Sequence, residues 1–423
     1  MSDFDHTASP EALSAAVLGW LDLYWDTQHR GPLGEPEGNQ QLWRQKVFDA
    51  GLAVPSWPEE WFGLGMKPAQ CKVIEKAFAE RKAPGAGLDR YHLGAITVFK
   101  AASDALKREM LPKLLTGPIC CLLYSEPNAG SDLAGIRTRA ERDGERFIIN
   151  GQKVWTSNAA EAEYGMLLAR TDWDVPKHRG ITFFLFPMKQ QGVEIRPINQ
   201  ITGESEFNEI FIENAVVPER FMIGKLNEGW ASFQTAIAYE RLIMGQGITE
   251  RRRGASAKGR SPLLELAAKT HRLQDPVIRQ RLAQALAYRE VNRLNNERAK
   301  RDMMTNGSLS LMSLSKLAMS RIQHGEAAIA TDLLGPASLL DGPDNADPAN
   351  TNFDAAKAYM NSIGGGTDQI QRNIIAEKVL GLPKEYEPEK GTSFREVKSD
   401  AGSRNGELAQ LSRHSRILAF SLH

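Results

Sequence analysis

The amino-acid sequence predicts an α+β fold in which a small β domain lies between two helical domains. Apolar residues at helical spacing extend to about residue 118, short strands and turns follow over 120–221, and helical spacing returns over 226–382. Helices, then strands, then helices are typical of α+β assemblies. The predicted boundaries are 1–119 for the N-terminal helical domain, 120–222 for the middle β domain, 223–385 for the C-terminal helical domain and 386–423 for a polar tail.

The N-terminal domain is predicted to be mostly helical. Leu13, Val17 and Leu21 recur at helical spacing within residues 12–25. Similar patterns predict further helices over 42–48, 69–81 and 103–115.

The middle domain carries two hairpin signals, Asp143-Gly144 and Asn150-Gly151, because these residue types accept positive φ angles. A buried strand is predicted over 181–186, with further strand residues at 193–195 and 210–212 and an end at Pro218. The C-terminal domain is predicted to hold helices over 230–244, 276–304, 309–334 and 354–361, with a polar mobile loop over 341–352. The polar tail is expected to be disordered, or to bind a partner or the CoA side of the site.

Composition excludes several classes of protein. Lys+Arg and Asp+Glu are both 52, so a broad electrostatic nucleic-acid surface is not expected, although a local basic patch stays open. Three cysteines rule out a disulfide scaffold and are expected to be buried free thiols. No segment approaches the ~20 apolar residues of a membrane span, and the N-terminus does not resemble a signal peptide. We therefore expect a cytoplasmic protein that contacts no membrane.

Missing motifs narrow the chemistry further. The sequence has no G-x-G-x-x-G, P-loop or G-x-S-x-G motif, which argues against nicotinamide, nucleotide triphosphate and serine-hydrolase sites. Its eight histidines are scattered and no Cys-x-x-Cys occurs, so no metal site is expected.

Three segments are candidates for ligand binding, with structural alternatives open for the first two. The loop over 124–132 is rich in hydroxyls and small residues, and serves either as a polar ligand loop or as a structural turn. Residues 154–158 place Trp155 beside two hydroxyls, which suits an aromatic ligand, or else a core Trp. In 364–372, three glycines allow close backbone approach, and Thr367 is predicted to be the N-cap of a helix.

Together and in this order, these segments resemble the acyl-CoA dehydrogenase family over residues 42–385. The matching motifs are Ser125-Glu126-Pro127-Asn128-Ala129-Gly130-Ser131-Asp132, Asn150-Gly151-Gln152-Lys153-Val154-Trp155, Thr202-Gly203 with Phe211 and Val217-Pro218, and Gly366-Thr367-Asp368-Gln369-Ile370-Gln371-Arg372. The resemblance implies a C-terminal four-helix bundle and an FAD enzyme that oxidises an acyl-CoA thioester to the trans-2-enoyl-CoA. By the same resemblance, the FAD-binding residues are Tyr124, Ser125, Gly130, Ser131, Trp155, Ser157, Gly335, Thr367 and Gln369.

Two departures from the family pattern concern contacts between subunits. The family's Gly-Gly-x-Gly loop corresponds here to Gly335-Pro336-Ala337-Ser338. The family's Arg-x-Phe-Gly segment has no clean match, and the basic residues of 251–260 lie in its place, either as an FAD contact or as a solvated loop.

The catalytic base is also displaced. Many family members carry a carboxylate where this sequence has Gly365, while a minority place it in a Glu-Arg-Leu element, here Glu240-Arg241-Leu242. Trp230, Phe233 and Glu240 share one helical stripe, so the carboxylate is expected to be desolvated and its pKa raised. Glu240 is therefore predicted to be the base, with a structural salt bridge as the alternative, and Arg241 is at most a substrate contact.

The resemblance also assigns a role to Gly365, whose backbone N–H would bind the thioester carbonyl. The missing side chain suggests a hypothesis that the site accepts branched or bulky acyl groups, such as a steroid side chain. The implied partners are an electron-transfer flavoprotein and further subunits, in a homotetramer or a mixed tetramer. The alternatives are an acyl-CoA oxidase that uses O₂, a non-catalytic partner subunit, and a flavin monooxygenase of similar fold.

Overall fold

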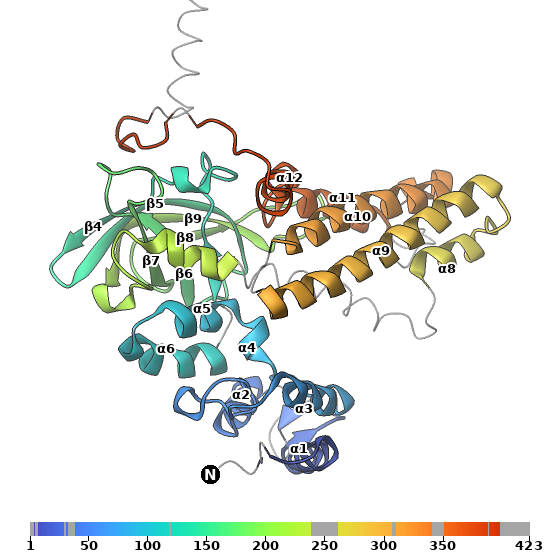
Figure 1. Cartoon of the computed structure of the whole chain (residues 1–423), viewed down its shortest axis with the longest axis horizontal. Coiled ribbons are helices and arrows are strands. Elements are labelled where there is room, and N and C mark those ends of the chain that lie inside the picture. The colour runs from blue at the N-terminus through green and yellow to red at the C-terminus, as the bar shows by residue number, and fades with distance from the viewer. Residues whose placement is uncertain are drawn as a thin grey trace, which may run out of the picture. The chain divides into compact units, whose positions relative to one another are not determined.

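The computed structural model describes residues 4, 7–28, 31–32, 39–117, 120–237, 261–306, 310–340, 351–387 and 389–397. The chain forms two compact units, the first from residues 1–198, 206–236 and 387–423, and the second from residues 199–205 and 237–386. Helices, a sheet and further helices follow one another along the chain (Figure 1), which confirms the predicted α+β class. The units are coarser than the predicted domains, so the boundaries near residues 119 and 222 stay predictions.

The first unit begins with α1 (Pro10–Tyr24), α2 (Gln40–Asp49), α3 (Pro68–Glu80), α4 (Leu88–Tyr91), α5 (Leu93–Ala101) and α6 (Asp104–Thr116), and β1 (Trp25–Asp26) pairs with β2 (Gly31–Pro32). The four predicted helices are confirmed within a few residues. Helix α5 was not predicted, because its residues 94–98 are all buried and show no amphipathic period.

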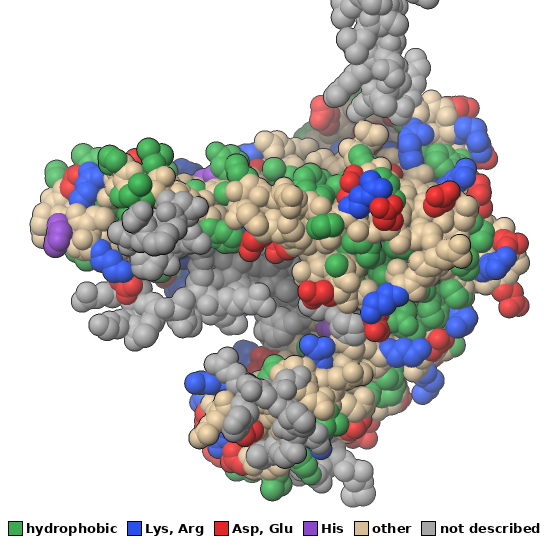
Figure 2. Space-filling view, turned by 180° about the vertical axis from the view of Figure 1, so that it is seen from behind, with side chains coloured by type: hydrophobic (Ala, Val, Ile, Leu, Met, Phe, Trp, Pro, Cys, Tyr) green, Lys and Arg blue, Asp and Glu red, His purple; other side chains and the backbone are tan. Residues whose placement is uncertain are grey.

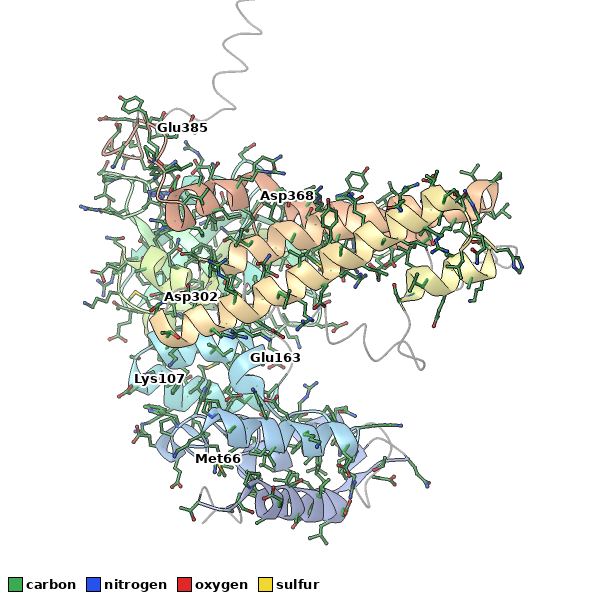
Figure 3. The ribbon with its side chains drawn as sticks, turned by 45° about the vertical axis from the view of Figure 1, so that its right-hand side comes forward. Met66, Lys107, Glu163, Asp302, Asp368 and Glu385 are labelled. Carbon is green, nitrogen blue, oxygen red and sulfur yellow. The ribbon has the colours of Figure 1, made fainter. Side chains whose placement is uncertain are left out.

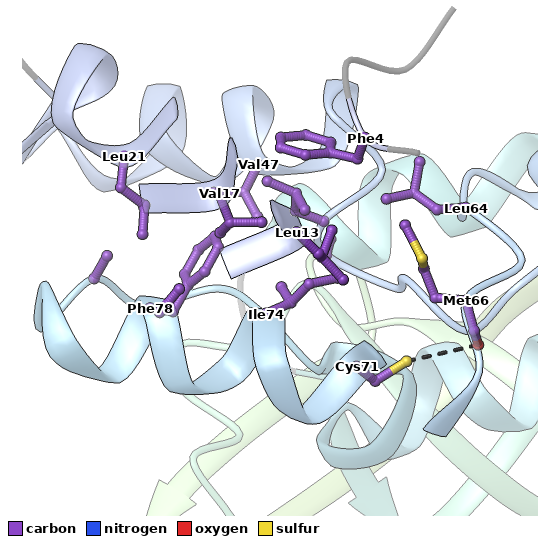
Figure 4. Packing of buried hydrophobic residues seen from close by; sticks show 14 of the residues in the cluster. Phe4, Leu13, Val17, Leu21, Val47, Leu64, Met66, Cys71, Ile74 and Phe78 are labelled. Atoms are coloured by element: carbon purple, nitrogen blue, oxygen red, sulfur yellow. Dashed lines mark hydrogen bonds between the residues drawn. The ribbon is translucent and has the colours of Figure 1, made fainter. Parts of the chain in front are cut away.

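Local capping fixes the starts of two of these helices. Ser9 Oγ accepts a hydrogen bond from the N–H of Ala12 (3.2 Å) before α1, and Ser103 Oγ caps α6 in the same way. Buried Leu13 and Val17 of α1 pack with Ile74 and Phe78 of α3 in one apolar cluster (Figure 4).

The predicted free thiols are confirmed. Cys71 and Cys121 are buried, Cys120 is half-buried, and none of the three forms a disulfide. Burial raises the pKa of Cys121 to about 12, so this thiol stays protonated at neutral pH.

The sheet of the first unit has the strand order β3-β6-β4-β5-β9-β8, and β7 pairs with β6. Strand β3 pairs parallel with β6, and the long β5 and β9 pair antiparallel. The strands are β3 (Cys121–Leu123), β4 (Arg139–Asp143), β5 (Arg146–Ser157), β6 (Tyr164–Arg170), β7 (Ile181–Pro187), β8 (Val193–Pro197) and β9 (Phe207–Pro218).

One hairpin signal is confirmed and the other is wrong. Asp143-Gly144 forms the turn between β4 and β5, with Gly144 at φ +61°. Asn150-Gly151 instead lies inside β5, where Asn150 opposes a bulge of β9 at Asn214. The Asn150 side chain donates to Asn214 Oδ1 (3.2 Å) and its Oδ1 accepts from the N–H of Asn214 (2.9 Å). The dipeptide therefore serves a bulge and not a turn.

The second unit is helical. Helices α9, α10 and α11 run alongside one another (Figure 1), and buried apolar side chains such as Leu282, Ile329 and Leu333 join α9 and α10. Of the predicted loop over 341–352, residues 341–350 lie outside the described residues. The prediction is wrong for residues 351 and 352, which begin helix α11. The elements are α8 (Pro262–Lys269), α9 (Pro276–Asn306), α10 (Met312–Leu334), α11 (Thr351–Ile363), α12 (Asp368–Ile374) and a π-helical turn (Ile375–Val379).

The expected disorder of the tail is wrong for residues 389–397. These residues pack on the first unit, and the side chain of Phe394 is only 2% exposed. The physical reason is an aromatic side chain that finds a buried place against the sheet. The tail beyond residue 397 lies outside the described residues.

The surface mixes charges of both signs. Over the face shown in Figure 2, Lys and Arg side chains are interspersed with Asp and Glu side chains. Within the described ranges, no helix is both long enough and apolar enough to span a bilayer.

Candidate functional site

The ends of β3 and β5 bring two of the predicted segments together in the first unit. The N–H of Val154 donates to the carbonyl of Ser125 (2.9 Å), and Thr156 Oγ1 donates to the carbonyl of Leu122 (3.2 Å). These bonds hold Tyr124 and Ser125 beside the strand that carries Trp155 and Ser157.

A bulge in β5 turns Trp155 and Ser157 outward. Between Lys153 and Thr156, two residues of β5 oppose one residue of β9, and Trp155 takes a left-handed φ of +63°. The alternation of the strand is thereby shifted, so that Thr156 is buried while Trp155 and Ser157 are exposed. The indole of Trp155 is 60% exposed, which excludes the alternative of a core Trp.

The loop over 125–132 begins with a tight turn. Glu126 and Ala129 exchange two backbone hydrogen bonds of 3.1 and 3.0 Å. Gly130 and Ser131 follow the turn and are exposed. Lys177 Nζ donates to Asp132 Oδ1 (2.9 Å) at the far end of the loop.

A buried ion pair supports this loop from beneath. The side chain of Lys153 is 0% exposed, and its Nζ donates to the carbonyl of Tyr124 (3.1 Å) and to Glu126 Oε1 (2.8 Å). The carboxylate of Glu126 also accepts from the N–H groups of Arg137 (2.6 Å) and Thr138 (2.9 Å). Burial alone would raise the pKa of Glu126, but the charge of Lys153 and these hydrogen bonds hold it below its ordinary value.

The helix over residues 229–237 leads toward the predicted base. Phe233 is 1% exposed, and its ring packs edge-on against Tyr124 with centroids 4.9 Å apart. Trp230 and Ile237 are half-buried, which agrees with the predicted apolar stripe as far as residue 237. Glu240, Arg241 and the basic segment 251–260 lie outside the described residues.

The glycine segment of the second unit has a special backbone. Gly365 and Gly366 have φ angles of +64° and +85°, which residues other than glycine rarely adopt. The side chain of Gln371 is fully buried, and its Nε2 donates to the carbonyl of Gly365 (3.0 Å). This bond orients the peptide group between Gly365 and Gly366.

The start of α12 is anchored as the sequence predicts. Thr367 Oγ1 accepts from the N–H of Ile370 (3.2 Å) and is the N-cap, while Gln369 is exposed. Asp368, labelled in Figure 3, accepts hydrogen bonds from Lys316 Nζ (3.3 Å) and Ser320 Oγ (2.8 Å) of α10.

Gly335 ends α10 in a conformation available mainly to glycine, with φ +57° and ψ −133°. Its N–H donates to the carbonyl of Thr331, and its carbonyl accepts from Ser338 Oγ (2.8 Å). The segment Gly335-Pro336-Ala337-Ser338 is thus a closed turn, held by the hydrogen bond from Ser338 to the Gly335 carbonyl.

The exposed ring and hydroxyls of the first unit fit the isoalloxazine of FAD. A flat ligand that is apolar on its face and polar along its edge can stack on Trp155 and hydrogen-bond to Ser157 and Ser125. The indole of Trp155 is 60% exposed, so its face is free to stack with such a ligand. No group of three metal-ligating side chains occurs within the described part of the chain.

Sequence reasoning missed three supporting residues. Lys153 is an even number of residues from the buried Phe147 and Ile149, so the alternation of a strand places it on the same face. This signal could have marked Lys153 as an interior residue. Arg170 and Gln371, both fully buried, gave no such local signal.

Comparison with known proteins agrees with this geometry. Three family models match in chain order: the acyl-CoA dehydrogenase N-terminal domain over 23–118, the middle domain over 121–215 and the C-terminal domain over 227–380. The acyl-CoA dehydrogenase IpdE1 of Mycobacterium tuberculosis is 34% identical over 391 residues, which cover 89% of this chain and 98% of the relative.

Solved structures share the fold. A steroid ACAD described as Tcur3481-Tcur3483 has a TM-score of 0.68 at 24% identity, over 90% of this chain and 100% of that chain. The ChsE4-ChsE5 complex of M. tuberculosis has a TM-score of 0.61 at 24% identity, over 90% of this chain and 99% of that chain. At this level of identity, the likeness concerns the fold.

Proposed function

The chain belongs to the acyl-CoA dehydrogenase family of FAD-dependent oxidoreductases, and from this premise we propose that it converts an acyl-CoA thioester to the trans-2-enoyl-CoA with Glu240 as the base. The observation that carries the proposal is the group of Trp155, Ser157 and Ser125 at the ends of β3 and β5. This group offers a stacking face and hydroxyls, which is what a flavin needs.

The family resemblance supplies the residues proposed to hold FAD. They are Tyr124, Ser125, Gly130, Ser131, Trp155, Ser157, Gly335, Thr367 and Gln369. Bound FAD would supply the acceptor for the hydride that leaves the β-carbon.

Glu240 would take the α-proton of the thioester. A base on an apolar helix stripe is desolvated, which raises its pKa toward the working pH and favours proton transfer. The stripe of this helix packs on Tyr124 through Phe233, so the helix contacts the start of the loop over 124–132. Arg241, the next residue, is proposed only as a substrate contact.

The N–H of Gly365 would donate to the thioester carbonyl as negative charge develops on it. A donor held in place before the reaction stabilises such charge without reorganisation. Gln371 supports this role indirectly. Its side chain holds the Gly365 carbonyl (3.0 Å), and the left-handed backbone of Gly365 sets the direction of the N–H relative to that carbonyl. Since Gly365 has no side chain, the acyl site is proposed to accept branched or bulky groups in preference to straight chains.

Electrons would leave through an electron-transfer flavoprotein, and the pathway served would be a β-oxidation of lipids. The active assembly is proposed to be a tetramer, either of this chain alone or of this chain with a second, related chain. The ChsE4-ChsE5 complex is a precedent for the second arrangement in a protein of the same fold.

The test is the visible spectrum of the purified flavoprotein, recorded anaerobically before and after addition of a panel of acyl-CoA thioesters. The flavin absorbance of wild type should bleach, and the thioester that bleaches it fastest identifies the acyl class. Glu240→Gln should bind FAD but bleach about 10²- to 10⁴-fold more slowly, because it cannot accept the α-proton.

Glu228→Gln is the matched control, since Glu228 is exposed near the start of the same helix. It should bleach like wild type. Equal bleaching by Glu240→Gln would make that residue structural, and a chain without flavin would point to a partner subunit. Hydrogen peroxide formed stoichiometrically in air would favour the oxidase.

A further inference from the structure

The C-terminal arm, residues 389–397, lies beyond residue 380, where the match to the C-terminal family model ends. The arm forms hydrogen bonds with the loop between β6 and β7. The N–H of Phe394 donates to the carbonyl of Val175 and the N–H of Arg395 to the carbonyl of Trp173, both at 2.9 Å. Ser393 Oγ also donates to the Trp173 carbonyl (3.1 Å). The arm is therefore held by its backbone as well as by its side chains.

The ring of Phe394 covers a buried cation. The guanidinium carbon of Arg170 lies 3.5 Å from the centroid of the Phe394 ring. The ring of Trp173 is tilted relative to the Phe394 ring, with 5.6 Å between the two ring centroids. Arg170 is 0% exposed. Burial lowers the pKa of Arg170 to about 10, which still leaves it charged at neutral pH. A cation–π contact is strongest when the cation is desolvated, as here.

Arg170 in turn holds the segment that follows the cofactor loop. Its Nη2 donates to the carbonyl of Ala134 (2.7 Å), and its Nε donates to the carbonyl of Ile136 (3.1 Å). In the β6–β7 loop, the Lys177 carbonyl accepts from Nη1 and Nη2 of the same guanidinium, both at 3.2 Å. The guanidinium thus joins the two segments under the ring of Phe394.

The same segment closes onto the loop that carries Ser125, Gly130 and Ser131. The N–H groups of Arg137 and Thr138, directly after Ile136, both donate to the carboxylate of Glu126. A continuous set of contacts therefore runs from Phe394 through Arg170 to the turn that begins the loop.

We propose that the C-terminal arm is a positioning element for the FAD loop: Phe394, acting through Arg170, holds residues 125–132 in the conformation that binds FAD. The inference rests on the proposed FAD site. Because coupling between two binding events is reciprocal, docking of the arm raises FAD affinity and FAD tightens docking of the arm.

The test uses the full-length chain with Phe394→Ala. FAD is titrated into the apoprotein to obtain Kd, and the thermal midpoint is recorded with and without FAD. The Kd for FAD should rise about five-fold or more, and the increase in midpoint on adding FAD should shrink. Phe394→Tyr keeps the ring over Arg170 and should restore both values.

Two further variants separate positioning from simple stability. Phe394→Leu keeps apolar volume but removes the ring, so it should reproduce the weaker FAD binding even where Phe394→Ala fails to fold. Arg395→Ala is the control in the same arm, since its ion pair with Asp174 is exposed at 63% and 70%, and its Kd for FAD should equal that of wild type.

Equal losses of midpoint with and without FAD, at unchanged Kd, would overturn the role of the arm and leave the proposed function intact. Wild type that takes up no FAD would overturn both. A loss of FAD affinity in Arg395→Ala equal to that in Phe394→Leu would also overturn the specific route through Arg170.

Discussion

Lys153 and Glu126 form an ion pair in the interior of the first unit, with 2.8 Å between Nζ and Oε1 and side-chain exposures of 0% and 9%. The pair lies between the two strand ends that carry Ser125 and Trp155. Its bond to the Tyr124 carbonyl links the charge on β5 to the backbone of the loop after β3. A buried charge of this kind is costly alone and stabilising only with its partner.

Lys153→Met should therefore lower the free energy of unfolding by about 3–5 kcal/mol, because it leaves the Glu126 carboxylate buried without its cation. Lys153→Met with Glu126→Gln should recover part of this loss. Urea denaturation measures both. Lys189→Met is the control, since its pair with Glu163 is 68% and 49% exposed, and it should change stability by less than about 0.5 kcal/mol. A loss below about 1 kcal/mol in Lys153→Met would contradict the prediction.

Gln371→Leu should slow flavin reduction about 10- to 100-fold. The Gly365 carbonyl loses its donor, so the backbone of Gly365 and its N–H can shift, and a small misplacement at a reacting centre is costly. Anaerobic stopped-flow reduction by the best acyl-CoA measures the effect. Asn361→Ala, which removes a hydrogen bond from Asn361 to Gln323 in the same unit, should reduce at the wild-type rate. Wild-type rates in Gln371→Leu would show that the Gly365 peptide needs no such support.

Gly151→Ala should destabilise the protein by about 1–3 kcal/mol, since a Cβ there would lie 2.4 Å from Thr138 Oγ1 and 2.7 Å from its Cα. Gly19→Ala gives the opposite expectation. Gly19 is exposed within α1 and a Cβ would meet nothing within 4 Å, so stability should rise by about 0.5–1 kcal/mol. Thermal unfolding of the two variants and wild type under one buffer tests both signs, and an unchanged midpoint for Gly151→Ala would count against the close approach.

His92 should make the N-terminal helices sensitive to acid. Its Nδ1 accepts from the N–H of Ala95 (3.1 Å) as the N-cap of α5, which requires a neutral ring. Burial lowers the pKa of His92 to about 4, helped by the charge of Arg44. The unfolded chain, with an ordinary His pKa near 6.5, binds the proton first, so stability is full above about pH 6.5 and falls as the pH drops toward 4.

His92→Asn keeps a capping acceptor that does not titrate. Between pH 7 and pH 4.5, wild type should lose on the order of 2 kcal/mol more stability than this variant, as measured by urea denaturation at each pH. Burial also raises the pKa of Asp89, but that contribution is common to both proteins and cancels in the difference. His271→Asn, at an exposed position, should follow wild type. Parallel pH profiles for wild type and His92→Asn would refute the prediction.

Local sequence signals predicted correctly those helix caps and turns that depend only on contacts between residues close in sequence. The Thr367 hydroxyl caps α12 by accepting from the N–H of Ile370, three residues later. Asp143-Gly144 forms a turn because the two strands that flank it, β4 and β5, pair with each other. Asn150-Gly151 carries the same type of signal, yet a distant strand captures it through Asn214. Propensity alone cannot tell these two cases apart, because the deciding partner lies in another part of the chain.

The candidate site shows the same division. The chemistry of Trp155 and Ser157 could be predicted from the motif, but only the bulge in β5 decides that they face outward. The burial of Phe394 depends on Arg170, a residue remote in sequence, so the polar composition of the tail gave the wrong expectation for 389–397.

The two bulges between β5 and β9 are opposite in sense. Near Asn214 the extra residue is on β9, and near Trp155 it is on β5, so the later pairs return to the register of the first ones. A deletion of either residue alone would slide one end of the strand pair past the other and reverse the faces of every side chain beyond it. A deletion of both would leave the ends in register but take the indole away. Insertions and deletions in this pair of strands should therefore be accepted in evolution only as compensating pairs.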